Sequence, residues 1–185
     1  MGTDIHGVFQ RRANGGWVEV PSQYKEDRHY QLFAVLAGVR NGYGFAGVET
    51  GEEVQPISEP RGLPADFVEG EKWLGDHSHS WLLGTEILKW AEKAPTVTQT
   101  GIVSRAVYDA WDGVSKPASY CGGISGFGVL VIRDNSFERQ QSSTWTHIRI
   151  EWQSSLKDEL AYFFEEVSRL VAEHGEVRFV FGFDS

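Results

Sequence analysis

The sequence is poor in cysteine and has no long hydrophobic run, and each of these absences excludes a class of protein. Cys121 is the single cysteine among 185 residues, so an internal disulfide is impossible, which is typical of a reducing compartment. No apolar run approaches the ~20 residues of a membrane-spanning helix. The first residues have neither the basic nor the apolar region of a signal peptide. We therefore expect a cytoplasmic protein that does not engage membranes.

Positive charge is also scarce. The chain has 26 Asp and Glu residues against 17 Lys and Arg residues, and its net charge is −9. Binding a nucleic-acid backbone requires clustered cations, so polymeric nucleic acid is not an expected partner. A small nucleotide is not excluded, because a few arginines placed close together suffice to hold its phosphates.

The remaining composition is that of a single α+β domain covering residues 1–185. Hydrophobic residues make up 41% and charged residues 23%, and a chain of this length buries roughly 70% of its unfolded surface. Alternation and turn residues predict an N-terminal hairpin, while Asp27 and Gly38 are a candidate cap and stop for the first helix. The predicted elements are strands at 1–12 and 17–20, helices at 27–38, 85–94 and 104–111, and a buried strand at 126–133.

The last forty residues predict a strand–helix–strand unit. Residues 146–152 alternate at period two, Ser155 is a candidate cap for one long helix, and Gly175 ends that helix before a strand at 177–183. Such a unit is a crossover, and its connection should be right-handed if the two strands share a sheet. The expected architecture contains a mixed β-sheet. The long stretch 40–76 is rich in Gly, Pro and acids, and such irregular segments are often binding loops or lids.

The most informative motif is Asp76-His77-Ser78-His79-Ser80-Trp81. In an extended backbone, residues two apart project to the same side, so His77 and His79 are predicted to reach one target. Histidine is a common ligand for zinc, iron or manganese and a donor to phosphate. The alternative is a pair of loop histidines that bind backbone carbonyls.

A second pair, Asp4 and His6, shares one face of the predicted first strand. Together with His77 and His79 it would form a plausible set of ligands for a divalent metal. The alternative is a solvated polar face on an edge strand.

Three arginines, Arg28, Arg40 and Arg61, lie in or beside predicted loops. Guanidinium groups on such loops bind phosphate or carboxylate through paired hydrogen bonds. Surface ion pairs are the commoner use of arginine in an acidic protein. Tyr30 and Trp81 are candidates for stacking against a base.

Five blocks of the sequence resemble a group of uncharacterised bacteriophage proteins. The blocks are MGTDIH at 1–6, RHYQLFAVLAGVR at 28–40, PRGLP at 60–64, HSHSW at 77–81 and FGFD at 181–184. Small phage proteins without structural, replication or lysis signatures are often counter-defence factors in the cytoplasm of the infected bacterium. One class of these binds or degrades nucleotide immune signals, and its binding members are often homo-oligomers.

The resemblance and the residues together leave three hypotheses. In the first, the chain sequesters a cyclic dinucleotide or an ADP-ribose derivative without turnover. In the second, it is a metal-dependent hydrolase of such a signal. In the third, its acidic surface binds and inhibits a basic host protein. The ligand-binding residues of the first hypothesis are Tyr30, Arg40, Arg61, His77, His79 and Trp81, and the metal ligands of the second are Asp4, His6, His77 and His79.

Overall fold

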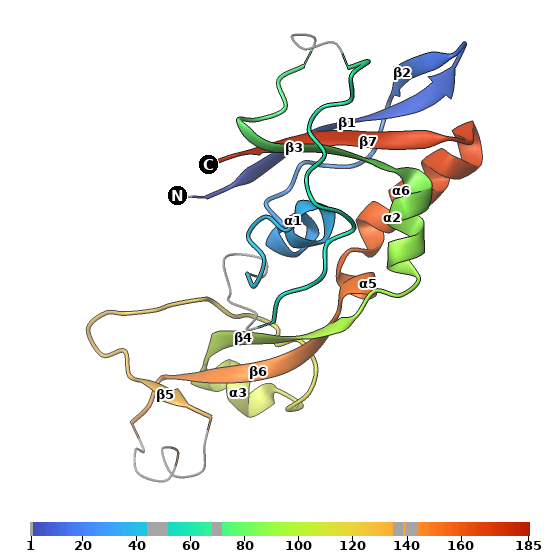
Figure 1. Cartoon of the computed structure of the whole chain (residues 1–185). Coiled ribbons are helices and arrows are strands. Elements are labelled where there is room, and N and C mark those ends of the chain that lie inside the picture. The colour runs from blue at the N-terminus through green and yellow to red at the C-terminus, as the bar shows by residue number, and fades with distance from the viewer. Residues whose placement is uncertain (1, 44–51, 68–71, 135–138, 140–143) are drawn as a thin grey trace.

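The strands in the described part of the chain form two sheets (Figure 1). The computed structural model describes residues 2–43, 52–67, 72–134, 139 and 144–185. The first sheet has the order β2-β1-β7-β3 and is antiparallel throughout. Its strands are β1 (Asp4–Ala13), β2 (Gly16–Val20), β3 (His77–Leu83) and β7 (Val177–Asp184).

The second sheet has the order β4-β6-β5, with β4 and β6 antiparallel and β5 parallel to β6. Its strands are β4 (Thr96–Ser104), β5 (Val131–Arg133) and β6 (His147–Ser155). The α+β class and the N-terminal hairpin are thus confirmed. The strands are divided between two sheets, however, where the sequence suggests one mixed sheet.

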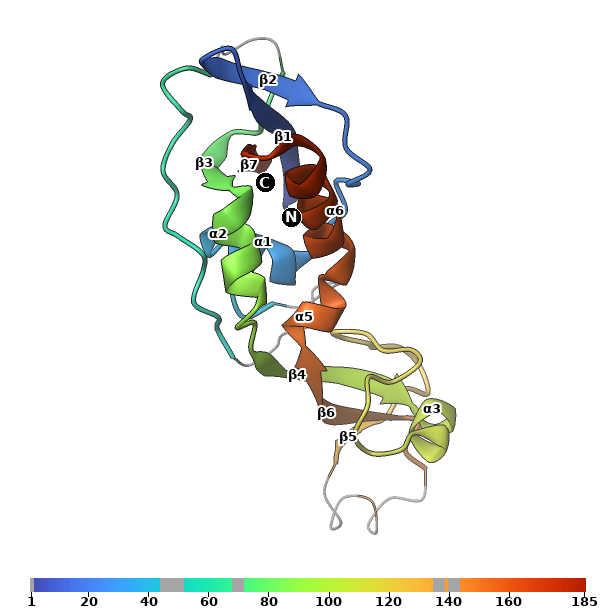
Figure 2. The ribbon, with the colours of Figure 1, turned by 90° about the vertical axis from the view of Figure 1, so that its right-hand side faces the viewer.

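Helices cover one face of the first sheet, here called its inner face (Figures 1 and 2). Phe179, Phe181 and Phe183 of β7 are fully buried on this face and pack in one core with Phe33 and Phe163. Alternation along β7 places these aromatic side chains on one side of the strand. The helices that the structure describes are α1 (Tyr30–Ala37), α2 (Gly84–Ala91), α3 (Arg105–Ala110), α5 (Leu156–Glu159) and α6 (Ala161–His174).

The irregular segment before β3 covers the opposite, outer face of the first sheet. Leu63 and Leu74 pack there with Val8, Val180 and Trp81. The buried Arg178 binds Asp66 of the same segment, with 2.9 Å between Nη1 and Oδ1. Residues 52–67 and 72–76 contain no helix or strand, as predicted, and the contacts above fix this part of the loop against the sheet.

The C-terminal helix differs from the prediction. Ser155 does cap it, since its Oγ accepts the amide of Asp158 at 3.4 Å. Leu160, at φ −106° and ψ 14°, then divides the helix into α5 and α6. Because β6 and β7 belong to different sheets, the strand–helix–strand unit links the two sheets and is not a crossover within one.

Two further predicted boundaries are wrong. The first helix begins at Tyr30, and His29, not Asp27, occupies its N-cap position, although Gly38 ends it at φ 69° as predicted. The expected buried strand at 126–133 is reduced to β5, and Phe127 is fully exposed. The positive φ angles of the glycines at 126 and 128 interrupt the extended backbone there. None of the helices in the described ranges has the length and apolar character that crossing a membrane requires.

Candidate functional site

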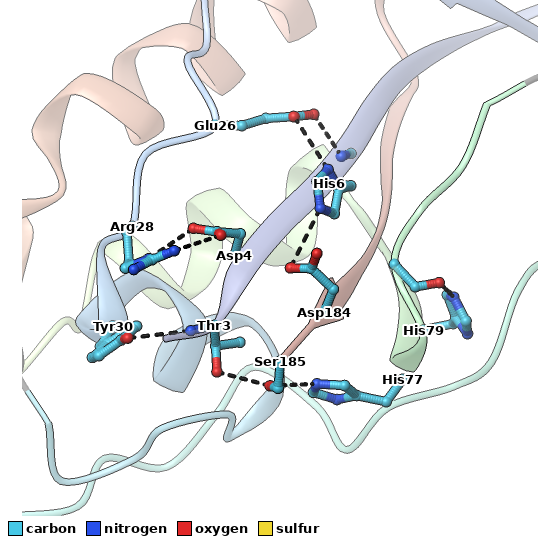
Figure 3. Close-up of polar contacts among 12 residues, drawn as sticks. Thr3, Asp4, His6, Glu26, Arg28, Tyr30, His77, His79, Asp184 and Ser185 are labelled. Carbon is cyan, nitrogen blue, oxygen red and sulfur yellow. Dashed lines mark hydrogen bonds and ion pairs between the residues drawn. The ribbon is translucent and has the colours of Figure 1, made fainter. Parts of the chain in front are cut away.

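The first and last strands bring the two ends of the described chain together at one end of the first sheet (Figures 1 and 3). Asp4 pairs with Asp184 and His6 pairs with Gly182 across β1 and β7. The inner face carries Ile5 and the β7 phenylalanines, so alternation directs Asp4, His6 and Asp184 to the outer face. The predicted sharing of one face by Asp4 and His6 is therefore confirmed.

His6 lies between two carboxylates at this end of the sheet (Figure 3). Its Nδ1 is 3.6 Å from Oε2 of Glu26, and its Nε2 is 3.5 Å from Oδ1 of Asp184. The ring of Trp73 contacts the imidazole at 4.5 Å between centroids, and this tryptophan is more than half exposed. The carboxylates and the indole together fix the orientation of the His6 ring.

Asp4 and Arg28 form a two-point ion pair beside His6. The Nε and Nη2 atoms of Arg28 donate to the two carboxylate oxygens of Asp4 at 2.8 and 2.6 Å. The guanidinium group holds the pKa of the Asp4 carboxyl below its usual value, and the carboxylate in turn raises the pKa of Arg28. About half of each side chain is exposed, so the pair remains open to a ligand.

A second polar network surrounds the fully buried Thr3 (Figure 3). Thr3 donates its amide to the Tyr30 hydroxyl at 3.2 Å, and its Oγ1 accepts from Nε of Arg40 at 2.7 Å. The Oγ of Ser185 lies 2.9 Å from Thr3 Oγ1 and 3.1 Å from Nε2 of His77. Arg40 also lies over the Tyr30 ring, at 5.7 Å from its centroid. The structure therefore connects three of the predicted ligand-binding residues, Tyr30, Arg40 and His77.

The two histidines of the central motif do not share a side of the strand, so that prediction is wrong. His77 pairs with Phe183 and Ser80 pairs with Phe181, which leaves two residues on β3 opposite one residue on β7. This β-bulge includes Ser78, whose φ is +51°. The extra residue reverses the alternation between His77 and Ser80.

The bulge gives the two imidazoles different partners. His77 is stacked with the ring of Phe183 at 6.1 Å between centroids and reaches Ser185. His79 lies on the outer face against Gly182, and its Nε2 is 3.1 Å from the carbonyl oxygen of Gly75. For His79, the contact with a backbone carbonyl agrees with the alternative, although the residue lies on β3 and not in a loop.

The four predicted metal ligands are not assembled into one set. Asp4 binds Arg28, His6 lies between carboxylates, and the two histidines of β3 point to different partners. Within the described ranges, no three His, Cys, Asp or Glu residues are grouped so that they could hold a metal ion. The bulge is the physical reason, because it separates the two histidines on which the set depends.

Arg61 and Trp81 also lie outside this site. Arg61 donates to both carboxylate oxygens of Glu86 on α2, at 3.0 and 2.7 Å, and lies over the Trp81 ring at 5.0 Å. The ion pair lowers the pKa of Glu86 and raises that of Arg61. Arg61 therefore forms a surface ion pair, which was the alternative given above. Trp81 packs under the loop that carries Arg61.

A groove of about 520 Å³ adjoins the His6 cluster, and Glu26 and Lys72 belong to both. Glu26 accepts the amide of Gly7 at 2.9 Å, and Lys72 donates to the carbonyl oxygen of Gly7 at 3.1 Å. The two side chains thus satisfy the backbone of β1 at a point beyond its pairing with β2, which extends from Phe9 to Ala13. The groove also exposes parts of Glu19 and Lys25, so its lining offers both signs of charge.

Compared with protein-family models, curated proteins and solved structures, the chain gives no match. The assignment of a site therefore depends on geometry alone. Four of the five sequence blocks described above contribute to this end of the sheet, although they are far apart in the sequence. The exception is the block at 60–64, whose arginine is bound to Glu86.

Several residues of the site are not predicted from the sequence. Asp184 stands in one of the noted blocks but carries no local pattern of a binding residue. Glu26, Lys72 and Trp73 lie in irregular segments whose path depends on packing, so no spacing could have indicated them. The residues of the site not predicted from the sequence are Thr3, Glu26, Lys72, Trp73, Asp184 and Ser185.

Proposed function

We propose that the chain binds and sequesters a small nucleotide-like ligand at this end of the first sheet. The ligand class is a cyclic dinucleotide or an ADP-ribose derivative, and the setting is phage counter-defence in the cytoplasm of an infected bacterium. We further propose that the protein acts as a homo-oligomer. The observation that carries the proposal is that polar residues from four sequence blocks meet at this one end of the sheet, with Arg28 bound to Asp4 and His6 beside Asp184.

The guanidinium groups and the carboxylates of the site are complementary to different groups of such a ligand. Arg28 and Arg40 supply guanidinium groups, which bind phosphate oxygens through paired hydrogen bonds. Asp184 and Glu26 supply acceptors for ribose hydroxyls or for the amino group of a base. The exposed Trp73 supplies a flat surface beside them for stacking.

Binding without cleavage is supported by the contacts that the imidazole nitrogens make with the protein. Both ring nitrogens of His6 face carboxylates, and its Nε2 is buried from solvent. The Nε2 atoms of His77 and His79 contact Ser185 and a backbone carbonyl. A general base must reach the proton that it abstracts, and each of the four ring nitrogens named in this paragraph is directed at a group of the protein.

Recovery of the ligand after binding tests the proposal. The purified protein is incubated with cyclic dinucleotides and ADP-ribose derivatives, denatured by heat, and the supernatant is analysed by chromatography. Intact ligand released only by heat is the expected result. A changed product would support the hydrolase hypothesis, and no binding to any of the compounds would contradict both. Analytical ultracentrifugation of the same sample tests the oligomeric state.

Substitution of Arg28 locates the binding site. We expect Arg28→Gln to weaken binding of the recovered ligand by about 10-fold or more, because it removes a charge-assisted hydrogen bond from a half-exposed side chain. Arg61→Gln is the matched control, since it makes the same chemical change at an arginine bound to Glu86. Calorimetric titration measures both affinities. Equal affinities for the two variants would place the ligand elsewhere on the molecule.

A further inference from the structure

A glycine-rich segment, residues 121–130, projects from the second sheet between α3 and β5 (Figure 1). The segment contains no charged residue. At one end, Cys121 and Ile102 exchange two backbone hydrogen bonds of 2.9 and 2.8 Å. At the other end, the carbonyl oxygen of Leu130 accepts the amide of Thr146 at 3.0 Å. The segment is therefore fixed to the sheet at both ends, while residues 122–128 between them are exposed to solvent.

A tight turn in this segment presents Phe127 to solvent. The amide of Val129 donates to the carbonyl oxygen of Gly126 at 3.2 Å, which closes a four-residue turn. Gly128, the third residue of the turn, has a φ of +76°, a conformation that glycine adopts readily. Phe127, the second residue, is fully exposed. Because the turn already fixes the backbone that carries the ring, little further ordering of that backbone is needed when the ring binds a partner.

A hollow of about 410 Å³, here called the α3 hollow, lies beside α3 in the same part of the molecule. The apolar side chains in its lining include those of Val107, Ala110 and Trp111. Nε1 of Trp111 donates to the carbonyl oxygen of Ser115 at 2.5 Å, so the position of the indole ring is fixed. Phe127 of the same chain does not fill the hollow, because its side chain is fully exposed.

The charged groups of the α3 hollow are already bound within the chain. In the described part of the chain they are Asp112 and Lys116. Lys116 donates to the two carboxylate oxygens of Glu159 at 3.0 and 2.7 Å. Asp112 accepts the amides of Val114 and Ser115 at 2.9 and 2.8 Å. Neither charge requires a charged ligand, so the complement of the hollow is an uncharged apolar group, and the segment 121–130 is uncharged.

We propose that Phe127 of one copy of the chain inserts into the α3 hollow of a second copy, which returns the same contact. One inserted ring buries roughly 150–250 Å² of its own surface and about as much of the hollow. With the exposed Ile124 and Leu130 at the rim, two insertions bury on the order of 1,200 Å², the lower limit of stable interfaces, which a single insertion does not reach. The partner is therefore a second copy in a closed, reciprocal pair.

This pairing deepens one part of the proposed function, the homo-oligomer, by naming its surface. It does not depend on ligand binding, because the interface includes none of the residues at the end of the first sheet. Association is therefore measured on protein without ligand, and ligand binding is measured separately with Arg28→Gln. A protein that pairs but binds no nucleotide would contradict the ligand proposal alone, and a monomer that binds nucleotide would contradict the pairing alone.

Analytical ultracentrifugation over a range of protein concentrations tests the interface. The unaltered chain is expected to show a monomer–dimer equilibrium. Phe127→Ser is expected to weaken the pairing by about 100-fold or more, because each pair loses two buried rings. Ala110→Arg, which fills the hollow, is expected to have the same effect. Both residues are exposed, so neither change alters the core. Val18→Ser, at an exposed apolar residue of β2, is the control and is expected to leave the pairing unchanged.

A mixture of the two variants tests whether ring and hollow contact each other. Phe127→Ser keeps an open hollow, and Ala110→Arg keeps an exposed ring, so together they can form one insertion. Unlabelled Ala110→Arg is titrated into nitrogen-labelled Phe127→Ser, and the indole resonance of Trp111 is expected to shift. Unlabelled Phe127→Ser is expected to cause no shift, and Trp111→Phe identifies the resonance. A monomeric unaltered chain, pairing that survives Phe127→Ser, or an unshifted indole in the mixture would overturn the proposal.

Discussion

Replacing Gly75 by alanine is expected to lower the free energy of unfolding by about 3 kcal/mol or more, through strain and steric overlap in the backbone. Gly75 has a φ of +84°, and a Cβ atom there would overlap the backbone nitrogen, carbonyl carbon and oxygen of Phe183. Neither backbone segment can yield easily, because the next amide, that of Asp76, donates to the Phe183 carbonyl at 2.6 Å. Equilibrium unfolding in urea measures the loss.

Gly15→Ala separates the two components of this effect. Gly15 has a φ of +80°, almost the same as Gly75, but a Cβ atom there would meet nothing within 4 Å. We expect the free energy of unfolding of this variant to fall by only about 1 kcal/mol, which is the cost of a left-handed backbone conformation at alanine. If the two variants were equally stable, the close approach of the backbone at Gly75 would be refuted. The comparison also bears on the site, since the carbonyl of Gly75 holds His79.

Local patterns are sufficient to predict the hairpin and the face of the first strand. Asn14 and Gly15 both have positive φ angles, at 51° and 80°, as a two-residue hairpin turn requires. The alternation of Ile5 and Phe9 with His6 and Val8 assigns the inner and outer faces correctly. These features depend on residues close in the sequence, so the sequence predicts them well.

The arrangement of His77 and His79 depends on information that the sequence does not carry locally. Ser78 adopts a φ of +51°, a conformation for which serine has no special preference. The bulge there accompanies the register in which β3 pairs with β7 and the packing of His79 against Gly182. A rule of alternation that holds for regular strands therefore gave the wrong side for one of the two histidines.

The site itself follows from pairing between the first and last strands. Asp4 meets Asp184, and Thr3 meets Ser185, only because β1 and β7 are neighbours in the sheet. Nothing in either segment alone specifies that pairing, so the acidic partner of His6 could not be identified from the sequence. Residue type and sequence block predict Tyr30, Arg40 and His77 as ligand-binding residues, and the fold connects these three through Thr3 and Ser185.

Acidification from pH 7 to pH 4 is expected to cost about 3 kcal/mol of folding free energy through His29. Burial lowers the pKa of this histidine from 6.5 to about 4, and the nearby charge of Lys116 lowers it further while that of Glu159 opposes the shift. Between these two values the unfolded chain binds a proton that the folded chain does not. The stabilisation is therefore complete above pH 6.5, falls as the pH decreases, and is lost when the pH passes through about 4.

His29→Gln removes this titration and isolates its contribution. The unfolding free energy of the variant is expected to depend less on pH between 7 and 4, by about 3 kcal/mol, than that of the unaltered chain. Glu166, whose pKa is lowered to about 2 chiefly by Arg169, loses its stabilisation only below pH 4.5, so the two windows are largely separate. Proton NMR of the His29 imidazole is expected to show a midpoint near 4. If the free energies of unfolding of the two proteins changed with pH in the same way, the imidazole would not be held neutral by burial. His29, the N-cap residue of α1 next to Tyr30, would then not be an acid-sensitive position of the fold.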